Sequence, residues 1–154
     1  MKSLPYESAT SGDKALTEIQ SILGQFGCGT FGTMIDATRG VTLVQFVWKD
    51  RPVSIEASWK GYAAAWLKRH PYTHRMRCDR TQHELHALTQ AKISVCSILR
   101  DWVKAQITAY ECGLLPFESV FMPYLMLPDG RRLLDRVQTE ILALPPSDHP
   151  ASSN

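Results

Sequence analysis

The chain has 154 residues, 44% of them hydrophobic and 21% charged, and a formal net charge of +2. This composition predicts one globular domain with a buried core, and no run approaches the ~18 apolar residues of a membrane-spanning helix. The opening residues, MKSLPYESATSGD, lack the apolar stretch of a secretory signal, which predicts a cytoplasmic protein.

Residues 1–12 are rich in Ser, Thr and Gly and are predicted to form an arm that precedes the folded domain, residues 13–144. The first helix is predicted from Asp13 to Phe26, because apolar residues recur there at intervals of three and four. Ser11 or Thr10 can cap its start, and a glycine follows its last residue, as is typical of helix ends.

Three short segments rich in Val, Ile, Thr, Phe and Trp come next and are predicted to be strands. They span Thr30–Asp36, Val41–Lys49 and Pro52–Ser58, and the turn-forming sequences ATRG and KDRP separate them. Such short connections favour an antiparallel meander.

Two helices are predicted after the meander. The first covers Trp59–Arg69 and ends before Pro71, which disfavours a helical conformation at the residue before it. The second starts at the capping-box pattern Thr81-Gln82-His83-Glu84 and runs to about Cys112. Its predicted inner face consists of Leu85, Leu88, Val95, Leu99, Trp102, Gln106 and Ala109.

The C-terminal part is predicted to contain a short helix at Pro116–Met122, a turn at residues 128–130 and a last helix from Arg131 to Leu144. The tail, residues 145–154, is predicted to be disordered. The predicted fold class is therefore α+β: an N-terminal helix, a three-stranded antiparallel meander, then a helix, one long helix and a C-terminal helix. The apolar face of the last helix is expected to join the core through Leu133, Leu134, Val137, Ile141 and Leu144.

The strongest local charge lies at residues 60–80, here named the basic segment. It holds six basic residues against one acid, a local charge of +5, while the whole chain carries only +2. Guanidinium and ammonium groups neutralise phosphates, and aromatic rings can stack on exposed bases. The candidate contact residues for nucleic acid or another partner are Lys60, Lys68, Arg69, Tyr72, Arg75, Arg77 and Arg80. Trp59, Tyr62 and Trp66 share a helical stripe, which is more typical of core.

A second pattern overlaps the first: His70, His74, Cys78, His83 and His86 are residue types that bind zinc. Their spacing fits no standard zinc signature, and the arginines between them disfavour a dication. The sequence therefore predicts no metal and no cofactor, with these histidines as polar loop and surface residues. The four cysteines form no CxxC pair and are expected to be free thiols, most of them buried.

No nucleotide-binding loop, nucleophile elbow or nuclease pattern is present in the sequence. A non-catalytic protein is therefore expected, although a catalytic site without a sequence signature stays an alternative. The apolar run VFMPYLML at 120–127 either closes the core or, with the long helix and residues 117–127, forms a homo-oligomer interface.

Three stretches resemble a group of small phage and prophage proteins of proteobacteria. They are LPYESATSG, SWKGYAAAWLKRHPYT and SILRDWVKAQITAYECGLLPFESVFMPYLMLPDGR, and they are spread over residues 4–131. The resemblance implies a mobile element in the cytoplasm of a bacterial host cell, and it implies no activity and no functional residue.

Two functions follow as hypotheses. The first is a non-catalytic binding protein of a phage or mobile element that contacts DNA or RNA through the basic segment. The alternative is an anti-defence protein, anti-CRISPR-like, that inhibits a host nuclease or a host nucleoprotein complex. It would use the same basic surface or the apolar residues 117–127.

Overall fold

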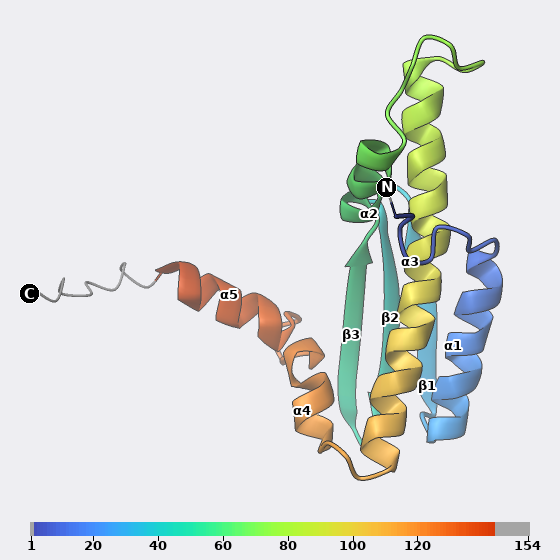
Figure 1. Ribbon diagram of the computed structural model, residues 1–154. Coiled ribbons are helices and arrows are strands. Elements are labelled where there is room, and N and C mark those ends of the chain that lie inside the picture. The colour runs from blue at the N-terminus through green and yellow to red at the C-terminus, as the bar shows by residue number, and fades with distance from the viewer. Residues whose placement is uncertain (1, 144–154) are drawn as a thin grey trace, which may run out of the picture.

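The computed structural model describes residues 2–143, so Leu144 and the predicted tail 145–154 lie outside the described residues. The fold is α+β, with the predicted order of elements (Figure 1). The elements are α1 (Gly12–Phe26), β1 (Thr30–Asp36), β2 (Val41–Trp48), β3 (Arg51–Ser58), α2 (Lys60–Arg69), α3 (Arg80–Glu111), α4 (Phe117–Phe121), the 3-10 helix η1 (Met122–Tyr124) and α5 (Leu133–Ala143).

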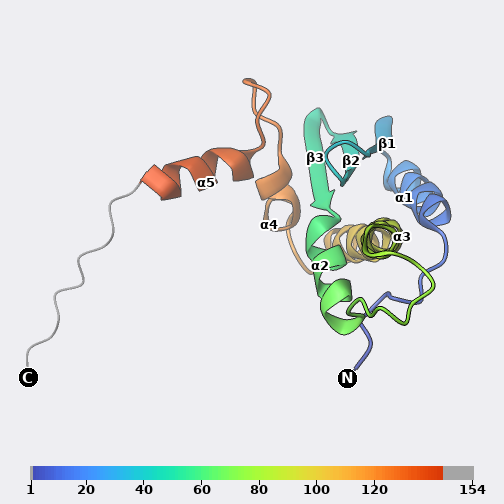
Figure 2. The same ribbon diagram turned by 90° about the horizontal axis from the view of Figure 1, so that it is seen from above.

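The molecule has two layers, a three-stranded antiparallel sheet in the order β1-β2-β3 and a layer of helices. Seen from above, α1, α2 and α3 lie on one side of the sheet and leave its other face open (Figure 2). Successive residues of a strand point to opposite faces. Val44 and Phe46 of β2 are buried toward the helices, whereas Gln45, between them in the chain, is exposed on the open face.

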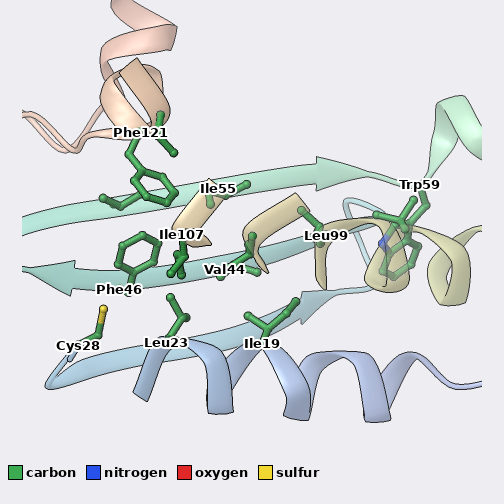
Figure 3. Packing of buried hydrophobic residues seen from close by; sticks show 14 of the residues in the cluster. Ile19, Leu23, Cys28, Val44, Phe46, Ile55, Trp59, Leu99, Ile107 and Phe121 are labelled. Carbon is green, nitrogen blue, oxygen red and sulfur yellow. The ribbon is translucent and has the colours of Figure 1, made fainter. Parts of the chain in front are cut away.

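The core lies between the sheet and the helices α1 and α3 (Figure 3). Ile19 and Leu23 of α1 are fully buried, as the predicted stripe requires. The first helix is held at both ends as expected: the Ser11 side chain accepts a hydrogen bond from the Lys14 N–H, and Gly27 adopts the left-handed conformation with φ 96°.

The long helix α3 buries a different face from the one predicted. Val95 and Leu99 are buried, as expected, but Leu85 is 62% exposed and Leu88 39% exposed. The buried row instead contains His83, Ala87 and Ala91, each one turn after the last, and His83 packs beside Trp66 of α2. Neither α3 nor any other helix within residues 2–143 is long and apolar enough to cross a membrane.

The start of α3 corrects a second prediction. The capping box is formed by Asp79 and Gln82, not by Thr81 and Glu84. The Asp79 carboxylate accepts a hydrogen bond from the Gln82 N–H at 2.7 Å, and the Gln82 side chain accepts one from the Asp79 N–H at 3.2 Å. Both patterns are present in the sequence, and Asp79 is the stronger cap because its charge complements the positive end of the helix.

The segment after α3 extends the sheet. Phe117, Val120 and Phe121 are buried, so this part of the apolar run does close the core. The chain then forms a tight hairpin around the turn at residues 128–130, in which the Leu127 N–H donates to the Arg131 carbonyl. The Met126 N–H donates to the Pro52 carbonyl, which pairs the hairpin with the outer edge of β3.

The last helix departs most from the prediction. It starts at Leu133 instead of Arg131, because residues 131–132 belong to the hairpin. None of its residues is buried: Val137 is 40% exposed and Ile141 60% exposed, although both were predicted to join the core. In both overall views α5 projects away from the sheet beyond β3 (Figures 1 and 2).

Candidate nucleic-acid interface

The basic segment lies at one end of the molecule, where α2 ends and α3 begins. Lys68 and Arg69 form the last turn of α2, and the chain then leaves the helix at His70. Residues 70–79 form a loop that extends past the end of α3, shown in green at the top of Figure 1. The fold thus presents Arg75 and Arg77 on a projecting loop, with Lys68 and Arg69 before it on α2 and Arg80 after it on α3.

A cluster of imidazole rings around Trp66 holds the loop in place. His83, in the first turns of α3, is only 6% exposed, and its Nε2 lies 2.6 Å from the His70 carbonyl oxygen. The Trp66 ring centroid lies 4.4 Å from that of His70, 5.3 Å from that of His83 and 5.6 Å from that of His86. The prediction that these histidines are all polar loop and surface residues is therefore wrong for His83, which anchors the loop.

Within residues 2–143, no three His, Cys, Asp or Glu side chains come close enough to hold a metal ion. His70, His83 and His86 share Trp66 as a neighbour, with their ring planes tilted or edge-on to the indole. His74 lies beside Tyr72 instead.

The N-terminal arm covers one side of the segment. The Glu7 carboxylate bonds to His70 Nε2 and accepts a hydrogen bond from the Leu4 N–H at 2.9 Å. The Leu4 N–H, and after it His70, hold the pKa of Glu7 below its usual value of 4.5. The Tyr62 hydroxyl donates to the Pro5 carbonyl at 2.7 Å, so the arm is tied to α2 as well.

The arm and the end of α2 line an open pocket of about 370 Å³ at the edge of the basic segment. Arg69 lines it and is only partly exposed, and its Nη1 is buried without a hydrogen-bond partner among the described residues. The other five charged candidates are exposed to solvent: Lys60, Lys68, Arg75, Arg77 and Arg80. Arg69 therefore belongs to the wall between loop and arm, and the five others form the outward-facing charge.

The arginines of this protein fall into two groups. Six lie outside the basic segment, and each forms an ion pair with a carboxylate: Arg39, Arg51, Arg100, Arg131, Arg132 and Arg136. The four inside it, Arg69, Arg75, Arg77 and Arg80, form none with any residue in the described range 2–143. In the described range, ion pairs therefore neutralise the arginines outside the basic segment and none of those inside it.

Lys60 and Lys68 extend this charge along α2. They are eight residues apart, so both lie in one row on the exposed side of the helix, separated by ~12 Å. Lys60 begins the helix and lies at the far end from the loop. The candidate surface is therefore a stripe that continues from the loop onto α2.

The aromatic residues contribute less than the charges. Trp59 is 7% exposed and Trp66 8% exposed, which confirms that they belong to the core. Tyr72 is half-buried, with its ring centroid 5.7 Å from that of His74 and 5.9 Å from that of His83. The surface is accordingly cationic, with little exposed ring area for stacking.

The sequence did not point to two positioning residues, Glu7 and His83. Glu7 is 63 residues from His70 in the chain, and no local pattern marks that contact. The signal for His83 was present: it lies one turn before Ala87, which continues the same buried row on α3.

In comparisons with known proteins, no family model, no curated protein and no solved structure matches this chain.

Proposed function

We propose that this protein binds nucleic acid without catalysis and that its contact surface is the basic segment, residues 60–80. The observation that carries the proposal is the division of the arginines. Those elsewhere on the described surface are paired with carboxylates, whereas those of the segment are not. A guanidinium group without an ion-pair partner in the protein can contact a phosphate without first breaking an ion pair.

The geometry supports contacts to the phosphate backbone more than reading of bases. Arg75, Arg77 and Arg80 are exposed on or beside a projecting loop, where a strand can approach from several directions. The two tryptophans of the region are buried, so stacking can involve only the half-buried Tyr72. The proposed binding is therefore electrostatic and weakly selective for sequence.

The test is a fluorescence anisotropy titration at ~50 mM salt, where such contacts are strong. Labelled single-stranded DNA, duplex DNA and RNA are compared with the wild-type chain and with the triple variant Arg75→Ala, Arg77→Ala, Arg80→Ala. Loss of three phosphate contacts is expected to weaken binding at least tenfold. Absence of binding by the wild type to all three probes at this salt concentration would contradict the proposal.

A matched control separates the position of the charge from its total. The triple variant Arg39→Ala, Arg51→Ala, Arg136→Ala also removes three positive charges, each from an exposed ion pair elsewhere on the surface. Such pairs contribute roughly 0–1 kcal/mol each, so this variant is expected to fold. It is also expected to retain most of the binding.

A second candidate, inhibition of a host defence nuclease or nucleoprotein complex, follows from the same surface. The scarcity of exposed aromatic rings in the basic segment favours it, because an acidic protein surface requires only charge. Purification of the tagged chain from infected or prophage-bearing cells distinguishes the two. Inhibition is supported if a host protein co-purifies with the wild type but not with the variant lacking Arg75, Arg77 and Arg80, while nucleic-acid binding is the same for both.

A further inference from the structure

The helix α5 exposes an apolar stripe that nothing in the described chain covers. Val137 and Ile141, one turn apart, are 40% and 60% exposed, Leu142 next to Ile141 is 86% exposed, and no residue of the helix is buried. Isolated helices shorter than ~12–15 residues are marginal in water, and α5 has 11 residues. Its stability as a helix therefore requires a surface on which this stripe can pack.

The open face of the sheet carries a matching apolar groove. The groove has a volume of about 550 Å³ and lies over the row in which Gly32, Gln45 and Ser54 pair across the three strands. A Cβ at Gly32 would meet nothing within 4 Å, so the groove has open space at this position. Val47, Pro52 and Met126 are among the other residues that line it.

The hairpin that precedes α5 keeps the helix away from the groove of its own chain. The Leu133 N–H donates to the Leu125 carbonyl at 2.9 Å, and the Met126 N–H donates to the Pro52 carbonyl at 2.9 Å. Arg132 forms two hydrogen bonds to Asp135, at 2.7 and 2.8 Å, in the first turn. Together these contacts direct α5 outward beyond β3, so docking on its own sheet would break the hairpin (Figure 2).

We infer that α5 packs into the groove of a second copy of this chain, in a symmetric dimer where each subunit donates its helix to the other. Met126 lines the groove and belongs to the same hairpin that carries α5, so a two-fold axis beside the hairpin brings each helix to its partner's groove. The same pair of surfaces is used twice, as a closed two-fold interface requires.

The contact area agrees with this arrangement. A helix of 11 residues is ~16 Å long and ~10 Å across, so half of its cylindrical surface is about 250 Å². An equal area of sheet gives about 500 Å² for each contact and about 1,000 Å² for the two, which is near the lower limit of a specific interface. The dimer is therefore expected to dissociate in the micromolar range.

The first test measures the mass of the full-length chain by sedimentation across concentrations from about 1 to 200 μM, a range that brackets the expected dissociation constant. The wild type is expected to reach twice the mass of one chain. The variant Val137→Asp, Ile141→Asp places charge on the exposed stripe and is expected to remain a monomer. The control Thr139→Asp, Ala143→Asp adds the same charge to the opposite side of α5 and is expected to dimerise.

The second test blocks the groove without touching α5. Gly32→Gln fills the groove with a side chain for which the single chain has space, and it is expected to abolish dimerisation. Gly61→Gln is the matched control, because a Cβ at Gly61 also meets nothing within 4 Å and lies on α2. It is expected to leave the dimer intact.

Mixing the two blocked variants gives the most specific result. The chain with Gly32→Gln has an intact α5, and the chain with Val137→Asp, Ile141→Asp has an intact groove, so the mixture can form one of the two contacts. A mixed dimer that neither variant forms alone supports the exchange. A monomeric wild type, or a dimer unaffected by Gly32→Gln, overturns it.

Discussion

His83 shows how one side chain can position a whole loop. It is almost fully buried, packs beside Trp66 and bonds to the His70 carbonyl, at the residue where α2 ends and the loop begins. A buried imidazole must satisfy its polar atoms, so this contact ties the loop to α3. The exposed arginines of the loop depend on it for their place.

Replacement of His83 by Ala is expected to lower the free energy of unfolding by about 1–3 kcal/mol, because the His70 carbonyl loses its partner and the Trp66 ring loses a neighbour. Urea unfolding followed by tryptophan fluorescence measures the change. His74→Ala is the control, since His74 is exposed in the same loop and its loss is expected to cost under about 0.5 kcal/mol. Equal effects of the two variants would contradict the anchoring role.

Burial also divides the cysteines by reactivity. Burial raises the pKa of the Cys28 thiol to about 11, and it raises the pKa of Cys96 as well. Cys112 is exposed and Cys78 half-buried, so the expectation that most cysteines are buried holds for two of the four. With a pKa of about 11, Cys28 is roughly 0.1% thiolate at pH 8, whereas an ordinary thiol with a pKa near 9 is roughly 10% thiolate.

Labelling with a thiol reagent at pH 8 is therefore expected to modify Cys112 first and Cys28 last. Mass spectrometry of tryptic peptides after a short pulse measures the order. In urea all four cysteines should react at similar rates, because the burial is lost. Rapid modification of Cys28 in the native protein would contradict its position in the core.

At the scale of elements, local sequence patterns predicted well which helices and strands the chain forms. The strands were predicted to within one residue at each end, because turn residues interrupt β-branched runs at positions 37–40 and 49–50. The face that a helix buries was predicted poorly for α3, because its partner α2 packs against alanines and leaves Leu85 and Leu88 outside. Periodicity alone does not tell which of two adjacent rows meets a neighbour.

The start of α3 gives a direct test at this scale. Asp79→Ala is expected to lower the free energy of unfolding by about 1 kcal/mol, because it removes the side chain that caps the helix. Thr81→Ala, at the position where the sequence predicted the cap, is expected to change it by less than about 0.5 kcal/mol. Chemical unfolding curves of both variants measure the difference, and a larger loss from Thr81→Ala would contradict the observed cap.

The helix α5 marks a different limit of sequence reasoning. Its apolar stripe correctly predicted a helix, and the natural inference was that the stripe joins the core of the same chain. A single sequence carries no sign of whether such a stripe packs within one chain or against a second one. The direction of the hairpin that precedes α5 supplies that information, and it depends on the pairing of Met126 with Pro52.

At the scale of the whole molecule, charge and apolar surface lie in different places. The basic segment lies at the end of the molecule where α2 ends and α3 begins, whereas the open face of the sheet lies on the side away from the helices and α5 projects beyond β3 (Figures 1 and 2). The sequence located the charge correctly, since charge density is a local property. It did not reveal which arginines are paired, because the carboxylates that pair with Arg39 and Arg51 are 17 and 67 residues away.

Because these surfaces are separate, the proposed nucleic-acid binding and the proposed dimerisation use different residues. The proposed dimer leaves both basic segments exposed, so binding of nucleic acid and dimerisation can be measured separately on the same variants. The earlier hypothesis of an interface through residues 117–127 would have to use what remains exposed there, chiefly Met122 and Pro123, because Phe117, Val120 and Phe121 are buried within one chain.

The central claim is that the basic segment neutralises phosphates, and the salt dependence of binding measures this most directly. Five phosphate contacts predict that the logarithm of the association constant falls with the logarithm of salt concentration at a slope of about −4.5 on duplex DNA. The variant lacking Arg75, Arg77 and Arg80 is expected to give about −1.8, and the variant lacking Arg39, Arg51 and Arg136 to keep the wild-type slope. A wild-type slope near zero, or an equal reduction in both variants, would contradict the account.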